Sequence, residues 1–308
     1  METVKRMEVP IEIRALKTAN VYDLSDNILF DTGMSENSFN IIKNNMNVKQ
    51  IDKIIISHLH IDHIGGAASF NKNYNIPIYI SSDDYDYIKG FVSSESNYFD
   101  SYLAMMETNG VPDNILSQIM SSHPMIKFSD YYKNLELNKI DFNIDNFEIV
   151  NVPGHSPGSI ALYSKQDKSL LSGDHLLGKI TPNISVYSSD HDYLGLYLNS
   201  LEKIKNLDVH TVFPGHGEPF KNYRERINEI QVHHKKRIEK ILNVLDSYKT
   251  VYQIASEIEW SKSRHMETMN PMEQNFAIME TMAHIIYMKN HNIIIGDEIK
   301  GLKRYITN

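Results

Sequence analysis

Four side chains of the types that bind metal ions lie within six consecutive positions: His58, His60, Asp62 and His63. Imidazole and carboxylate groups suit zinc and other first-row metals. In an extended backbone His58 and His60 point the same way, because side chains two residues apart share a face. A turn at glycines 65–66 would re-aim Asp62 and His63 toward a second point. The segment therefore predicts a metal site rather than a surface cluster of histidines.

Three later segments each offer one more candidate ligand: His155, Asp174 and His216. A glycine stands directly before each of them, and a short apolar run precedes that glycine. The glycines and prolines around His155 predict a tight turn, which would hold the imidazole in a fixed direction. The repeated pattern is a buried strand that ends at a glycine and then presents one ligand. We therefore expect all seven side chains to meet at one centre.

The composition restricts the chemistry that this centre can use. The chain of 308 residues has no cysteine, so thiolate zinc ligands, disulfides and cysteine nucleophiles are excluded. No apolar run approaches about 18 residues, and the first residues lack an apolar signal core. We expect a cytoplasmic protein with no membrane partner. The net charge of −8 argues against nucleic acid as the main partner.

Strands and helices alternate around the candidate ligands, which predicts an α/β fold with ligands at strand ends. Residues 8–33, 51–57, 76–81 and 135–173 have strand character, and the strand at 51–57 leads into His58. Helices are expected at 35–47, with Ser35 as N-cap, from Asp62 to about Phe70, and from Tyr193 to Lys205. Residues 83–122 predict a helical insertion, rich in aromatic residues, that either caps the metal site or forms its own core.

The composition changes after residue 221, which predicts a catalytic domain at 1–221 and a second domain at 222–308. Helices are expected at 224–246, after an N-cap at Thr250, and at 271–291, followed by a hairpin around Gly296 and Asp297. Residues 222–308 hold 13 Lys and Arg against 11 Asp and Glu, so this part is not basic. The run 235–237, with Glu239 beside it, predicts a solvated face.

The third of these helices carries five apolar side chains: Ile278, Met279, Met282, Ile285 and Ile286. They predict packing against the first domain or against a second subunit, so a homodimer is one alternative. The sequence assigns no role to His175, His233 or His234. Small molecules are the expected partners.

The order and spacing of the seven ligands, with an Asp31-x-Gly33 turn upstream, resemble the metallo-β-lactamase superfamily over roughly residues 8 to 220. The resemblance implies a four-layer αβ/βα sandwich, and residues 222–308 resemble the winged-helix domain of some members. It implies two divalent ions, with zinc expected and manganese, iron or cobalt as alternatives. One ion would be held by His58, His60 and His155, the other by Asp62, His63 and His216, with Asp174 as the bridge. Asp31 and Ser57 either orient ligating imidazoles or serve only as a turn residue and a residue at the end of a strand.

This resemblance implies a hydrolase in which a bridging hydroxide attacks a thioester, ester or lactone. Asp174 would position the hydroxide, and Asp62 would act first as a ligand. The arrangement is similar to glyoxalase II-like hydrolases and lactonases, although Leu177 stands where the lactonases carry a tyrosine. Two alternatives stay open. One is an endoribonuclease or phosphodiesterase acting on single-stranded nucleic acid, and the other is a persulfide dioxygenase with a single iron.

Overall fold

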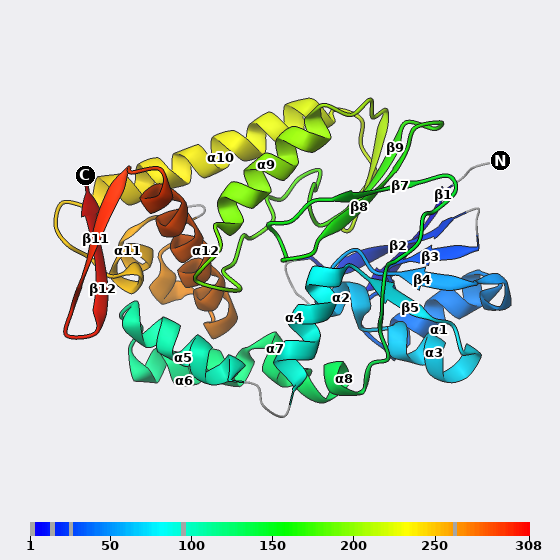
Figure 1. The fold of residues 1–308 in the computed structure, drawn as a ribbon, viewed down its shortest axis with the longest axis horizontal. Coiled ribbons are helices and arrows are strands. Elements are labelled where there is room, and N and C mark those ends of the chain that lie inside the picture. The colour runs from blue at the N-terminus through cyan, green and yellow to red at the C-terminus, as the bar shows by residue number, and fades with distance from the viewer. Residues whose placement is uncertain (1–3, 13–15, 25–26, 94–96, 261–263) are drawn as a thin grey trace.

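Two mixed sheets lie in the right-hand part of Figure 1, and the left-hand part is mainly helical. The computed structural model describes residues 4–12, 16–24, 27–93, 97–260 and 264–308. The first sheet has the order β1-β2-β3-β4-β5-β6, with antiparallel pairing up to β3 and parallel pairing beyond it. Its strands are Val4–Pro10, Thr18–Leu24, Ile28–Phe30, Lys53–Ile55, Ile78–Ile80 and Asn138–Lys139.

The second sheet has the order β10-β9-β8-β7, in which only the β10–β9 pair is parallel. Its strands are Thr211–Pro214, Ser169–Gly173, Ile160–Ser164 and Glu148–Asn151. Every residue of β8 and β9 is buried. Burial on both faces explains why these segments are apolar throughout and do not alternate with polar residues.

Three apolar clusters account for the packing of the sheets. Successive side chains of a strand face opposite sides, so Phe30 and Leu171 join a cluster between the sheets, while Leu29 and Leu170 join clusters on the two outer sides. Helices α1 (Glu36–Asn45) and α3 (Ala67–Tyr74) supply residues to one outer cluster, and α9 (Tyr193–Lys205) supplies residues to the other.

Two expectations for the first metal-binding segment need correction. The strand before His58 is β4 and is shorter than the predicted 51–57. The expected helix from Asp62 to Phe70 is divided into α2 (Ile61–Ile64) and α3. The division falls at glycines 65–66, which lie against the backbone of Met34 and Thr32 where a side chain would not fit.

The helical insertion lies between β5 and β6 in the chain and runs along the lower part of Figure 1, from α4 beside the first sheet to α5 and α6 at the lower left. It continues to Asn134 rather than ending near residue 122. Its helices are α4 (Ser82–Val92), α5 (Tyr98–Thr108), α6 (Asp113–Ser122), α7 (Pro124–Lys127) and α8 (Ser129–Asn134). Of its aromatic residues, Phe91 and Tyr132 belong to the outer cluster of the first sheet, whereas Tyr102 belongs to that of the second.

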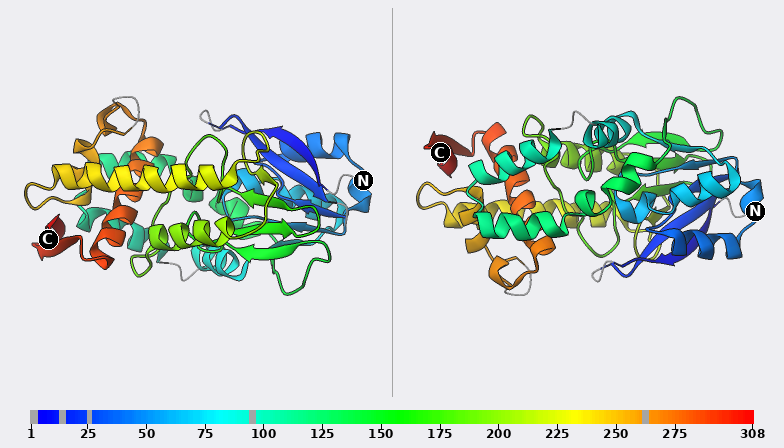
Figure 2. Two further views of the ribbon diagram at one scale, coloured as in Figure 1. Left: turned by 90° about the horizontal axis from the view of Figure 1, so that it is seen from above. Right: turned by 90° about the horizontal axis from the view of Figure 1, so that it is seen from below.

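The C-terminal residues form the predicted order of three α-helices and a hairpin: α10 (Tyr223–Val244), α11 (Val251–Glu257), α12 (Pro271–Asn290), β11 (Ile294–Ile299) and β12 (Leu302–Thr307). A short 3-10 helix, η2 (Met266–Thr268), precedes α12. Thr250 caps α11 through a capping box with Gln253, as its position predicted. The hairpin turn lies at Lys300 and Gly301, which both have positive φ, and not at Gly296 and Asp297. Figure 2 shows α10 running along the molecule toward this hairpin.

Helix α12 is buried on most of its surface and packs against α6, α9, α10 and α11 (Figure 1). Its apolar side chains share one cluster with residues of β8 and β9. The apolar third helix therefore packs within the chain, while the homodimer and the domain boundary after residue 221 stay predictions. No helix among the described residues is long and apolar enough to cross a membrane.

Candidate metal centre

All seven predicted ligands lie in turns or short helices that follow strands. His58 and His60 lie between β4 and α2, and α2 carries Asp62 and His63. His155 lies between β7 and β8, Asp174 directly follows β9, and His216 lies just after β10. A backbone hydrogen bond of 2.8 Å from Gly215 N to Gly173 O fastens the last two turns together.

The side chains meet in three overlapping groups whose candidate ligand atoms lie within 4.8 Å of one another. The groups are His58 with His60 and His155; His58 with His63 and Asp174; and Asp62 with His63 and His216. The first and third groups coincide with the two ligand sets that the family resemblance implied. Asp174 is placed between them, with Oδ1 3.3 Å from His63 Nε2 and Oδ2 3.7 Å from His155 Nε2.

The tautomers of His155 and His216 follow from their outer hydrogen bonds. Nδ1 of His155 lies 3.0 Å from the carbonyl oxygen of Asn183, and Nδ1 of His216 lies 2.7 Å from that of Thr18. A carbonyl oxygen only accepts hydrogen bonds, so both Nδ1 atoms donate. The Nε2 atom of each ring is therefore the one that faces the centre with a lone pair.

Asp31 and Ser57 hold two further imidazoles, as predicted. Nδ1 of His63 donates to Asp31 Oδ2 at 2.7 Å. The Ser57 hydroxyl donates to the same carboxylate oxygen at 2.8 Å, so it accepts a hydrogen bond of 2.9 Å from Nδ1 of His58. These contacts leave Nε2 of both rings directed at the centre.

His60 uses its nitrogen atoms in the opposite sense. Its Nε2 lies 2.7 Å from the hydroxyl of Tyr187, which donates its own proton to the carbonyl oxygen of His155 at 3.0 Å. Nε2 of His60 is therefore the donor, and its Nδ1 lies inward, 3.0 Å from Nε2 of His58. No local pattern pointed to Tyr187, because its partner lies 127 positions away in the sequence.

The donor set fits bound cations. Acceptor nitrogens face each other twice, at 3.0 Å between His58 and His60 and at 3.3 Å between His63 and His216. Such pairs need a cation, or failing that a proton, between them. Nε2 of His155 and Oδ1 of Asp174 are also buried with no hydrogen-bond partner among the described residues. Buried polar atoms seldom stay unpaired, so these atoms too are suited to metal ions.

The electrostatic environment differs between the two ends of the centre. Burial and the neighbouring imidazoles lower the pKa of His58 well below its usual range, and burial together with His155 lowers the pKa of His60 to about 3. Burial alone would also lower the pKa of His63, but the carboxylates of Asp174 and Asp31 raise it well above its usual range. The negative charges of these two carboxylates attract a proton at His63, and for the same reason they attract a divalent cation.

The carboxyl groups of the centre are held as anions. Burial would raise the pKa of Asp62, but the neighbouring His216 and His63 lower it to about 2. The nearby His216 and His63 likewise hold the pKa of Asp174 well below its usual range, against the effect of burial. Both side chains are therefore ready to bind metal at neutral pH.

Asp84, which the sequence did not single out, joins two of the ligand-bearing turns. Its carboxylate accepts hydrogen bonds from Leu59 N at 2.8 Å, Ser156 Oγ at 2.8 Å and Gly158 N at 2.7 Å. Leu59 lies between His58 and His60, and the other two residues follow His155 in its turn. Burial raises the pKa of Asp84 to about 7, although these three hydrogen bonds act in the opposite direction.

We expect Asp84→Ala to destabilise the protein by on the order of 3 kcal/mol, because it leaves buried donors unpaired. Denaturant unfolding of the apo protein measures this loss. Asp83→Ala, at the exposed neighbouring position, is the matched control and should change stability by less than about 1 kcal/mol. Equal stability of the two variants would contradict the role of Asp84 as a buried link.

The structure does not bring the other histidines of interest into the centre. His175 is buried next to the ring of Tyr197, and both of its nitrogen atoms lack a hydrogen-bond partner among the described residues. Nδ1 of His234 lies 3.2 Å from Nε2 of His284 on α12. His233 is half-buried on α10 beside it.

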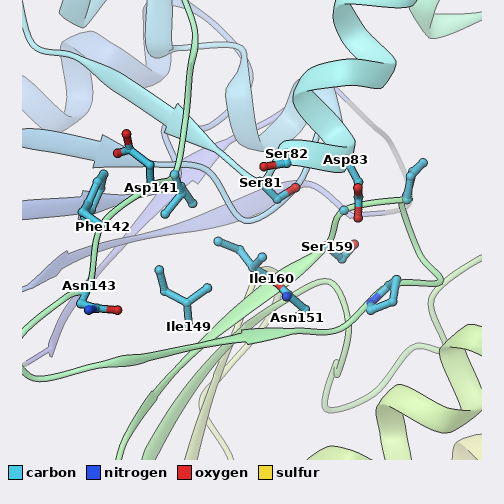
Figure 3. A pocket seen from close by; sticks show the side chains of 14 residues that line it. Ser81, Ser82, Asp83, Asp141, Phe142, Asn143, Ile149, Asn151, Ser159 and Ile160 are labelled. Carbon is cyan, nitrogen blue, oxygen red and sulfur yellow. The ribbon is translucent and has the colours of Figure 1, made fainter.

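A pocket of about 410 Å³ is bordered by Pro153 and Pro157, which flank His155 in its turn (Figure 3). Ser81, Asp83, Asp141, Asn151 and Ser159 are among the side chains that line it. None of the seven candidate ligands belongs to its lining. It therefore borders the loop that carries His155 without opening onto the metal centre.

Comparison with known proteins agrees with this arrangement. The family model described as the metallo-beta-lactamase superfamily matches residues 21–216. A beta-lactamase-like protein 2 homolog of Caenorhabditis elegans is 27% identical over 192 residues, which are 58% of this chain and 60% of that protein. The probable metallo-hydrolase MJ0888 of Methanocaldococcus jannaschii is 28% identical over 197 residues, which are 62% of this chain and 83% of that protein.

Solved structures share the fold over the whole chain. The metallo-beta-lactamase family protein TTHA1429 from Thermus thermophilus has a TM-score of 0.80 at 21% identity, covering 100% of this chain and 99% of that one. A beta-lactamase domain protein from Burkholderia ambifaria has a TM-score of 0.78 at 22% identity, covering 100% and 93%. The C-terminal helices and hairpin are thus part of a fold found in other proteins.

Proposed function

This chain belongs to the metallo-beta-lactamase superfamily, and from that premise we propose that it is a hydrolase with two divalent ions that cleaves a small carboxyl-derived substrate. The observation that carries the proposal is the set of five imidazoles, each bonded outward through one nitrogen and directed inward with the other. Several relatives are named probable metallo-hydrolases. A thioester, ester or lactone is the proposed substrate class, and zinc is the proposed metal.

Each residue of the centre has a distinct task in this proposal. His58, His60 and His155 would hold one ion, and Asp62, His63 and His216 the other. Asp174 would contact both and orient the attacking water by accepting a hydrogen bond. When bound, two divalent cations supply an activated water and polarise the carbonyl oxygen under attack.

Aromatic side chains beside His60 support the binding of an organic group next to the proposed centre. The ring of Tyr187 stacks on His60 with centroids 6.4 Å apart, and Tyr87 and Tyr193 contact Tyr187 at 5.2 and 5.4 Å. We propose that these tyrosines border the bound acyl group.

We propose that the two sheets and their outer helices form a four-layer αβ/βα sandwich at residues 1–221. Residues 222–308 would form a winged-helix-like domain, which the order of α10, α11, α12 and the β11–β12 hairpin supports.

The test is a substrate screen on zinc-loaded protein, combined with metal analysis of protein purified without added metal. We expect about two metal ions per chain and turnover of at least one thioester, ester or lactone. Single-stranded RNA, phosphodiesters and persulfides serve as the alternative substrates. Cleavage of RNA with a steep loss of affinity on adding salt, or a single iron with oxygen consumption on persulfide, would replace the proposal by the corresponding alternative.

A further inference from the structure

A buried ion pair joins the two long C-terminal helices. Glu280 of α12 accepts a hydrogen bond of 3.1 Å from Nε of Arg237 on α10, and both side chains are about one-tenth exposed or less. The guanidinium of Arg237 also lies 4.0 Å from the centroid of the Trp260 ring. Arg237 is thus not part of a solvated face, contrary to the expectation for residues 235–237. Separating the two side chains would leave each with an uncompensated buried charge. The pair therefore stays together and fixes the position of Glu280.

The second oxygen of Glu280 reaches the loop that follows Asp174. Oε2 of Glu280 accepts a hydrogen bond of 2.9 Å from Nδ2 of Asn183. The same amide nitrogen lies 3.3 Å from the carbonyl oxygen of Phe276, and Oδ1 of Asn183 accepts a hydrogen bond of 2.8 Å from Ser185. Both ends of the Asn183 amide are therefore occupied, and its side chain is fastened to α12.

The backbone of Asn183 in turn sets the ring of a candidate ligand. Its carbonyl oxygen accepts the hydrogen bond from Nδ1 of His155, 3.0 Å away. That contact keeps the proton on Nδ1 and aims Nε2 toward Asp174. Asp84 acts on the backbone of the His155 turn, whereas Asn183 acts on the imidazole itself.

We propose that Glu280 is a positioning residue for His155, acting through Asn183, so that the C-terminal helices complete the metal centre. The inference rests on the metal-ligand role of His155 in the proposed function. It assigns to α12 a task in metal binding, carried by one carboxylate about midway along the helix.

The experiment measures zinc affinity by competition with a chromophoric chelator and records the visible spectrum of the cobalt-loaded protein. Glu280→Gln and Asn183→Ala should each weaken binding of the ion held by His155 by about 10-fold, the range typical of residues that orient a metal-bound histidine. The cobalt spectrum should change in both. Because the two residues act in series, the double variant should bind zinc no more weakly than the weaker single variant.

Glu273→Gln is the matched control on the same helix. Glu273 pairs with Arg264 at 2.9 Å, but these side chains are 40% and 42% exposed, and glutamine can preserve the capping box. This variant should leave affinity and spectrum unchanged. Asn183→Ala keeps the Arg237–Glu280 pair intact, so the test stands even if Glu280→Gln does not fold.

Unchanged affinity and spectrum in Asn183→Ala would overturn the proposal, as would an equal loss in Glu273→Gln or additive losses in the double variant. These readouts need no substrate. Failure to cleave any carboxyl-derived compound would therefore count against the proposed function alone.

Discussion

Replacing His60 or Asp174 by alanine is expected to abolish turnover and leave the fold in place. His60 belongs to the first ligand group, and Asp174 lies between the two groups. Loss of either side chain removes a candidate metal ligand. Metal affinity and activity should therefore fall by more than the roughly 10- to 100-fold seen when only a residue that orients a ligand is lost. His60 provides no side-chain cap to α2, so its removal should not unfold that helix. Steady-state rates, metal content and far-ultraviolet circular dichroism measure the three effects.

The exposed residues His210 and Asp190 supply controls of the same residue types. His210→Ala and Asp190→Ala should keep wild-type rates and metal content. The mechanism would have to be abandoned if both His60→Ala and Asp174→Ala retained turnover of a substrate that the wild type cleaves. Loss of the circular dichroism signal together with activity would instead indicate that these side chains serve the fold.

The candidate ligands stand out in the sequence for two local reasons. His155, Asp174 and His216 each follow a glycine at the end of a short apolar segment, and the other four lie within six positions just after a strand. Helices with strong boundary signals were also predicted closely. The helix predicted from residue 271 begins at Pro271, the first residue of α12, and the side chain of Asn270 caps it. In these segments, local propensity and tertiary packing favour the same structure.

The residues that support the ligands could not be predicted in this way. Asp84, Asn183 and Tyr187 gain their roles only from partners between 25 and 127 positions away. Arg237 appeared solvated because its sequence neighbours are charged, whereas its partner Glu280 comes 43 positions later. Such contacts arise when separate elements pack, and no spacing rule in a single sequence describes them.

Gly215→Ala is expected to disrupt the metal centre. A Cβ atom at this position would overlap Oδ1 of Asp174 and lie 2.7 Å from Cε1 of His63. Neither neighbour can yield easily, since Asp174 contacts His63 and His216, and His63 is bonded to Asp31. The backbone is fixed as well, because Gly215 donates to Gly173 O and accepts from Asn20 N. The new methyl group must therefore displace Asp174 or His63 from the centre.

A displacement of about 1 Å in a catalytic group can lower the rate on the order of 100-fold, and overpacking costs about 1–3 kcal/mol of stability. Zinc affinity, turnover and denaturant unfolding of Gly215→Ala should show both losses. Gly90→Ala is the control, because no atom of a neighbouring described residue lies within 4 Å of its added Cβ and the site is exposed in α4. That change should stabilise the protein by about 0.5–1 kcal/mol through helix propensity. Wild-type zinc affinity in Gly215→Ala would mean that the turn after β10 can move without disturbing Asp174, and the close packing of the two turns would then have no part in metal binding.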